Sequence, residues 1–129
     1  MNSLNFMYKY ISKHTYNINL YKNNLIIGEL SFSLHNNLAI INNIEINSKY
    51  RNNNYGSMLL HNIEHNIKNI PNIKKITLLA WQPSGSTNVI DFFIKNQYIN
   101  INNHNNDNDI ITYDNSEILY DLHKFNKLL

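Results

Sequence analysis

The first half of the chain alternates between apolar and polar positions in three short segments. Residues 15–22 (TYNINLYK), 25–34 (LIIGELSFSL) and 38–46 (LAIINNIEI) have the period-two pattern that is typical of half-buried β-strands. Asn23-Asn24 and residues 35–37 (HNN) separate them, and asparagine accepts the positive φ of a tight turn better than most residues with a side chain. The pattern therefore predicts an antiparallel meander of three strands.

From Ser57 onward the apolar period changes to that of a helix. The apolar residues fall within about 100° of one helical face, the width of a stripe that packs on a core. They are Leu59, Leu60, Ile63, Ile67 and Ile70. Pro71 should end this helix, because proline cannot continue the hydrogen-bond ladder. A second helix is predicted over residues 86–96, with Asp91 and Lys95 one turn apart on its solvent side.

Strand-like segments alternate with these helices. Residues 73–80 (IKKITLLA) predict a strand bounded by Trp81-Gln82-Pro83, residues 97–101 another strand, and residues 102–109 a loop. Residues 116–129 fit both a helix and a strand, and the pattern leaves the two open. The order of the elements predicts an α/β (α+β) layer architecture. At 129 residues we expect a single domain, 1–129.

Composition narrows the classes of function. The net charge is +2, Arg51 is the one arginine and the lysines are scattered, so we expect no nucleic-acid partner. The chain has no cysteine, which excludes disulfides and thiolate metal sites. Asparagine makes up about a fifth of the chain, which we interpret as the mark of an AT-rich genome. Residues 1–20 lack a continuous apolar stretch and no segment is long enough for a membrane helix, so we expect a soluble, cytoplasmic protein.

The joint between the third strand and the first helix, residues 49–60 (KYRNNNYGSMLL), has the composition of an anion-binding loop. The first N–H groups of a helix have no intrahelical partner, and the helix dipole adds positive charge there. A phosphate can bind such an end if the loop lets the backbone approach closely. Asn54 and Gly56 are the backbone-permissive residues that this approach requires, and Arg51 stands at the mouth of the loop.

Two motifs resemble those of the GNAT N-acetyltransferase superfamily. Residues 44–68 (IEINSKYRNNNYGSMLLHNIEHNIK) are similar to its acetyl-CoA signature, an apolar strand end followed by Arg or Gln-x-x-Gly-x-Gly or Ala and an amphipathic helix. Arg51 and Gly56 match that signature, and Asn54 stands where the first glycine is usual. Residues 92–98 (FFIKNQY) resemble the superfamily's Phe-Tyr-x-x-x-Gly-Phe, with Gln97 in place of glycine. Order and spacing agree over about residues 25–102.

The resemblance implies a mixed, mostly antiparallel sheet with helices on its faces. The helices that usually follow the first strand look shortened or absent here, which leaves the acceptor side open or covered by the partner subunit of a homodimer. It also implies acetyl-CoA as cosubstrate, with strand backbone at the pantetheine and loop N–H groups at the pyrophosphate. The implied cofactor-binding residues are Ile44, Glu45, Ile46, Arg51, Asn52, Asn53, Asn54, Tyr55, Gly56, Ser57, Ser86, Asn88 and Phe93.

The resemblance implies acetyl transfer from the thioester to a primary amine of a small molecule or a peptide. The positions where relatives carry proton-handling residues fall on Trp81, Phe93 and Ile40, none of which titrates. Substitutes are Glu45, our candidate catalytic residue, Glu29 and Tyr98, although an exposed strand carboxylate or a core aromatic explains them as well. The alternative function is a non-catalytic module that uses the fold to bind coenzyme A or another protein.

Residues 61–65 spell H-x-x-E-H, which is a zinc-hydrolase pattern. His61, His65 and Lys68 lie opposite the apolar stripe of the predicted helix, so we expect them to face solvent. No third ligand is specified, and we expect no metal site.

Overall fold

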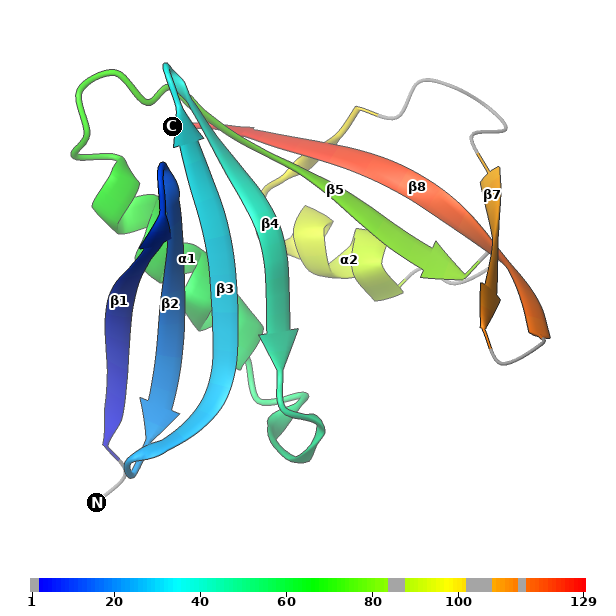
Figure 1. Cartoon of the computed structure of the whole chain (residues 1–129), viewed down its shortest axis with the longest axis horizontal. Coiled ribbons are helices and arrows are strands. Elements are labelled where there is room, and N and C mark those ends of the chain that lie inside the picture. Colours follow the sequence, from blue (N-terminus) through cyan, green and yellow to red (C-terminus); the bar gives the residue numbers. More distant parts are fainter. Residues whose placement is uncertain (1–2, 84–87, 102–107, 114–115) are drawn as a thin grey trace. The chain divides into compact units, whose positions relative to one another are not determined.

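The computed structural model describes residues 3–83, 88–101, 108–113 and 116–129, with the side chains of residues 3–80, 88–101 and 122–129 (Figure 1). The chain divides into two compact units. The first unit comprises Met1–Ile76 with Leu128–Leu129, and the second comprises Thr77–Lys127.

The first unit is built on an antiparallel meander of four strands. They are β1 (Leu4–Ser12), β2 (Thr15–Lys22), β3 (Leu25–His35) and β4 (Leu38–Ile46). The three predicted strands and the turn at Asn23-Asn24 are confirmed, and both turn residues have positive φ, 52° and 72°. The sequence did not reveal β1, because apolar side chains occupy both of its faces: Phe6 and Tyr8 alternate with Met7 and Ile11.

Helix α1 (Tyr55–Ile67) packs on β3 and β4. Its buried residues are Leu59, Leu60, Ile63 and Ile67, as predicted. The prediction that the helix continues to Pro71 is wrong. After Ile67 the chain tightens into three-residue turns, in which the N–H of Ile70 donates to the carbonyl of Ile67 at 2.9 Å. Ile70 is consequently 37% exposed and does not extend the apolar stripe.

Three irregularities change the register of the strands in the first unit. Between β1 and β2 the pairing passes from Tyr10–Tyr16 to Ser12–Thr15, which leaves Ile11 as an extra residue. Between β2 and β3 the pairing passes from Leu20–Gly28 to Tyr21–Ile26, which leaves Ile27 as an extra residue. Between β3 and β4 it passes from Ser31–Asn43 to Phe32–Ile41, which leaves Asn42 as an extra residue. All three are β-bulges, which bend a strand and often occur beside functional sites.

The second unit contains β5 (Lys75–Pro83, whose first two residues belong to the first unit), α2 (Asn88–Lys95), β6 (Ile99–Asn100), β7 (Asn108–Tyr113) and β8 (Ser116–Leu128). Strand β8 lies between β5 and β6 in the sheet, and β7 pairs with β8 in antiparallel register. Asp91 and Lys95 are both exposed on α2, as predicted. The first predicted residues of this helix, 86 and 87, lie outside the described residues.

Several boundaries in this unit differ from the prediction. Strand β5 begins two residues later and continues through Trp81-Gln82-Pro83, which had been placed at its end. Strand β6 has only two residues, since Gln97 takes a positive φ of 72° before it. Asn108 and Asp109 belong to β7 rather than to a loop. Residues 116–128 form a strand because antiparallel pairing with β7 and β6 satisfies their backbone, which decides between the two readings of the pattern.

Three aromatic rings form the centre of the second unit. The ring centroid of Phe93 lies 4.9 Å from that of Phe125 and 5.6 Å from that of Tyr98. All three side chains are at most 4% exposed. Tyr98 is therefore a core aromatic, and the reading of it as a structural residue is confirmed.

The architecture is α+β, with a mostly antiparallel sheet and helices packed on strands, as predicted. Residues 4–22 form the hairpin β1–β2, so no helix precedes β3 among the described residues. None of the helices described in the chain is long and apolar enough to cross a membrane.

Candidate functional site

The candidate site lies in the first unit, where β4 leads into α1. Strands β2 and β4 are both antiparallel to β3, so they run in the same direction (Figure 1). Their C-terminal ends therefore lie at the same end of the sheet, which we call the sheet edge. At this edge a short 3-10 helix, η1 (Ser48–Tyr50), and residues 51–54 connect β4 to α1. The edge therefore brings together the ends of two strands and the N-terminus of a helix.

Two asparagines shape the backbone of this loop. Asn52 and Asn54 both have a φ of 64°, in the left-handed region. A side chain in that region costs energy, and asparagine is among the few residues that occupy it readily. The prediction of a permissive backbone at Asn54 is confirmed. Gly56 differs from the prediction: it lies in the first turn of α1 with helical conformation, so it contributes the absence of a side chain rather than an unusual φ.

The N-terminus of α1 presents its backbone without a side-chain cap. Its first turn is closed by a hydrogen bond from the N–H of Met58 to the carbonyl of Asn54 at 3.0 Å. Within the described residues, the Asn54 side chain makes no capping hydrogen bond, and residues 55–58 carry no acidic side chain. The positive end of the helix dipole is thus not neutralised by the helix's own side chains.

The loop is held in shape by its own side chains. Arg51 donates from Nε to the carbonyl of Ile46 at 2.9 Å, which ties the loop to the end of β4. Asn53 donates from Nδ2 to the carbonyls of Arg51 and Tyr50 at 3.1 and 3.3 Å. The backbone conformation of the loop is therefore stabilised by hydrogen bonds from its own side chains.

Cationic and aromatic side chains lie beside this loop. The Nζ atom of Lys22, at the end of β2, lies 5.7 Å from the ring centroids of both Tyr50 and Tyr55. The Nζ atom of Lys49 lies 5.7 Å from the ring centroid of Tyr50. Lys22, Lys49 and Tyr50 were not among the site residues predicted from the sequence. The signal that could have found Lys22 is the meander itself, since it places the ends of alternate strands at one edge.

The remaining predicted site residues are divided between the two units. Ile44, Glu45 and Ile46 form the last three residues of β4, with Glu45 exposed and directly opposite Glu29 on β3. Asn88 is the exposed first residue of α2, whereas Phe93 on the same helix is buried. Ser86 lies outside the described residues. The roles of all these residues toward a cofactor stay predictions.

Helix α1 carries a second polar cluster, at its C-terminal half. His61, His65 and Lys68 are exposed, which confirms the prediction that they face solvent. The hydroxyl of Tyr8 donates to Oδ1 of Asn62 at 2.5 Å and accepts from Nδ2 of Asn66 at 2.6 Å. Burial raises the pKa of Tyr8 above its ordinary value, and the hydrogen bond from Asn66 partly opposes that rise. These bonds fix β1 to α1.

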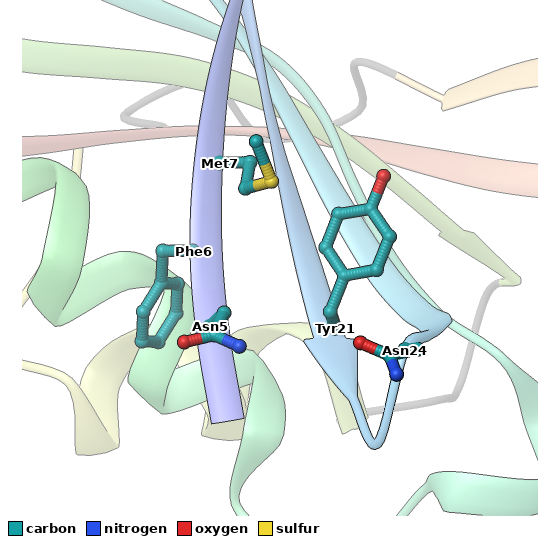
Figure 2. Close-up of a pocket in the computed structure, with 5 residues that line it drawn as sticks. All are labelled: Asn5, Phe6, Met7, Tyr21 and Asn24. Atoms are coloured by element: carbon teal, nitrogen blue, oxygen red, sulfur yellow. The ribbon is translucent and has the colours of Figure 1, made fainter. Parts of the chain in front are cut away.

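A hollow of about 390 Å³ lies at the hairpin of β1 and β2 (Figure 2). Its walls are Asn5, Phe6 and Met7 of β1, Tyr21 of β2 and Asn24 of the following turn. Asn5 and Tyr21 are cross-strand neighbours one register position away from Lys22, so they lie on the opposite face of the sheet from that lysine. Phe6 pairs with Leu20 and lies on the same face as Lys22, so the residues that line the hollow come from both faces of the hairpin.

No protein-family model matches the chain, and no curated protein matches it by sequence. Solved structures do match its fold. An acetyltransferase from Bacillus subtilis in complex with CoA superposes with a TM-score of 0.72 at 8% identity, covering 98% of this chain and 99% of that one. A GNAT family acetyltransferase from Elizabethkingia anophelis with acetyl-CoA bound gives 0.68 at 20% identity, covering 90% and 77%.

A third match is an acetyltransferase of the GNAT family from Streptococcus pneumoniae, with a TM-score of 0.69 at 14% identity, covering 92% of this chain and 69% of that one. At such low identity the agreement concerns the course of the backbone, not the side chains. The helices and strands of both units take part in it, since nearly the whole chain is covered. The chain has the fold of the GNAT acetyltransferases.

Proposed function

We propose that the protein binds acetyl-CoA at the loop between β4 and α1 and transfers the acetyl group to a primary amine. The observation that carries this proposal is the backbone conformation of the loop at residues 51–57, with Asn52 and Asn54 in the left-handed region and no capping hydrogen bond from the Asn54 side chain to α1. The N-terminus of a helix suits a diphosphate, because backbone N–H groups and the helix dipole both favour negative charge there. Two of the structures with this fold contain acetyl-CoA or CoA.

The proposal assigns the diphosphate of the cofactor to backbone N–H groups of the loop and to the guanidinium of Arg51. We expect residues 52–57 to donate backbone N–H groups to its oxygens. Arg51 donates one of its five guanidinium N–H groups to the carbonyl of Ile46. We expect the other N–H groups to donate to an anion at the mouth of the loop. We expect the backbone of Ile44, Glu45 and Ile46 to pair with the amides of the pantetheine.

The bound cofactor would supply an activated acetyl group, and the protein would position the amine against it. Positioning alone can lower the barrier by about 7–11 kcal/mol in favourable cases. The bulge at Asn42 leaves a residue of β4 without a partner on β3. Backbone N–H groups of this strand are our candidates for stabilising the developing oxyanion, a role worth about 3–4 kcal/mol.

The proposed acetyl transfer requires little acid or base catalysis from the protein. A thiol with a pKa of about 8.5 leaves readily as a thiolate, and an α-amino group with a pKa of about 8 is partly neutral at cellular pH. General-base catalysis would then add a factor of about 10² to 10⁴. Glu45 is exposed at the end of β4 and is our candidate for that role, whereas the buried Tyr98 is not.

A non-catalytic coenzyme A-binding or protein-interaction module is the second candidate function. It is favoured by one observation: Phe93 has no hydroxyl and Tyr98 is 2% exposed, so neither offers a proton to a leaving group. Thiol release from acetyl-CoA, assayed over a panel of amines, amino sugars and peptides, separates the two functions. Binding without release on any acceptor would favour the non-catalytic module.

Titration calorimetry with acetyl-CoA tests the loop itself. Gly56→Val places a branched side chain in the first turn of α1 and should abolish binding while the protein stays folded. Met58→Val is the matched control, because it introduces the same helix-disfavouring residue in the same turn, outside the expected binding residues. Normal binding by Gly56→Val, or equal loss in both variants, would contradict the assignment of the loop.

A further inference from the structure

Three cationic side chains gather at the sheet edge where the proposed diphosphate site lies. Lys22 ends β2, and Lys49 and Arg51 follow β4. The meander brings Lys22 to this edge from a distant part of the sequence, since β2 and β4 end together. Like-charge repulsion within such a cluster destabilises the folded protein. The cluster therefore indicates a functional role rather than a structural one.

The acidic residues nearest in the sheet do not neutralise this cluster. Leu20, Gly28 and Ile46 are directly paired across β2, β3 and β4, so they share one face with Lys22, which is two residues beyond Leu20. Glu29 and Glu45 are each one residue away from these positions and therefore lie on the opposite face. The face that carries α1 thus has an excess of positive charge at its edge.

Lys22 is positioned by aromatic rings rather than extended into solvent. Its Nζ lies 5.7 Å from the ring centroids of Tyr50 and Tyr55, and Lys49 shares the Tyr50 ring at the same distance. A cation within about 6 Å of a ring is held by the ring's quadrupole and keeps its hydrogen-bond donors for an anion. Tyr55 is also the first residue of α1, so Lys22 lies beside the N-terminal residue of this helix.

We propose that Lys22 and Lys49 bind the 3′-phosphate of coenzyme A and make the site select coenzyme A over its dephospho form. This inference rests on the proposed function, in which the backbone of residues 52–57 binds the diphosphate. The 3′-phosphate is a monoester with nearly two negative charges at neutral pH, and it sits one ribose away from the diphosphate. Two ammonium groups beside the same tyrosine ring supply positive charge for this phosphate, whereas residues 52–57 are expected to supply backbone donors for the diphosphate.

Calorimetric titrations of the full chain with coenzyme A and with dephospho-coenzyme A test the proposal. Wild type should bind coenzyme A about tenfold more tightly, the effect of one charge-assisted hydrogen-bond contact. Lys22→Gln and Lys49→Gln should each lower affinity for coenzyme A toward that of the dephospho form and leave the latter within about twofold. Lys22→Arg, which keeps the charge, should retain the preference. Rising ionic strength should shrink it.

Lys9→Gln is the matched control, since Lys9 is an exposed strand lysine whose cross-strand neighbour is Asn17 on the other face. It should change neither affinity, and thermal unfolding checks that every variant is folded. Equal binding of both ligands by wild type overturns the proposal while the proposed function stands. Equal weakening of both ligands by Lys22→Gln also overturns it, because the lysines would then serve the diphosphate. Binding of neither ligand refutes the proposed function together with this inference.

Discussion

Gly28 is the point at which the fold and the proposed cofactor strand depend on each other most closely. It lies on β3 opposite Ile46, and a Cβ at this position would lie 2.6 Å from Cδ1 of Ile46 and 3.2 Å from the carbonyl oxygen of Glu45. Cδ1 of Leu59 on α1 would be 3.4 Å away, at ordinary contact distance. Gly28→Ala should therefore push β4 away from β3 at its last residues.

The expected cost follows from these distances. Overpacking of a core costs about 1–3 kcal/mol, and the shortest contact is with the end of an isoleucine side chain, which can rotate away. The contact with the Glu45 carbonyl is with backbone and cannot be relieved in that way. Alanine also restricts the unfolded chain, which returns about 0.4–1 kcal/mol. We expect Gly28→Ala to lower the free energy of unfolding by about 1–2 kcal/mol and the melting temperature by about 4–8 °C.

Thermal and urea unfolding measure this effect, and two further variants locate its cause. Ile46→Val removes the Cδ1 atom that the new methyl group would meet, so the double variant Gly28→Ala/Ile46→Val should show a favourable coupling energy of about 0.5 kcal/mol or more. Gly56→Ala is the matched control, because Gly56 is helical and alanine there should raise stability by about 0.5–1 kcal/mol. Wild-type stability in Gly28→Ala, or no coupling in the double variant, would refute the reasoning.

Three other predictions concern residues described above. Asn54→Ala should lower the free energy of unfolding by about 1 kcal/mol, whereas Asn54→Gly should change it by no more than about 0.5 kcal/mol. The reason is that the Asn54 side chain makes no capping hydrogen bond, so only the left-handed φ distinguishes the two variants. Equal losses in urea unfolding would contradict this. The pKa of Tyr8 is raised in the folded protein, so the unfolded state loses the hydroxyl proton first and the free energy of unfolding should fall as pH rises above about 10. Tyr8→Phe should weaken this fall, measured as melting temperatures from about pH 8 to 11. An unchanged pH dependence in the variant would contradict the prediction. Phe125→Ala, in the aromatic centre of the second unit, should lower the free energy of unfolding by about 3–5 kcal/mol in a urea titration, and a loss below about 1 kcal/mol would show that the centre is loosely packed.

The sequence predicted best those elements whose two faces differ in polarity. Strand β2 buries Ile18 and Leu20 and turns asparagines to the other side, so its limits were read correctly. Strand β1 was missed because Met7 and Ile11 are apolar and exposed. The C-terminal segment stayed ambiguous because its pattern fits two periods, and only the pairing of β8 with β6 and β7, a property of distant residues, decides between them.

The candidate site was predictable in its backbone and not in its charges. Asn54, Gly56 and Arg51 are neighbours in sequence, so their pattern could be read directly. Lys22 joins them only because two strands end at one edge, and a prediction of that contact requires the strand order first. The hydrogen bond of Arg51 to Ile46 likewise depends on the path of the loop, which no local rule specifies.

The left-handed asparagines of the loop show that a glycine-type backbone conformation can be kept by a residue with a side chain. A backbone conformation can be kept within a fold while the residue at that position changes from Gly to Asn, wherever codon usage favours the exchange. Asn23, Asn24, Asn36, Asn52 and Asn54 all occupy such positions here. In asparagine-rich proteomes, a profile that scores the torsional class of each position would therefore recover glycine-dependent motifs that a profile of amino-acid identities passes over.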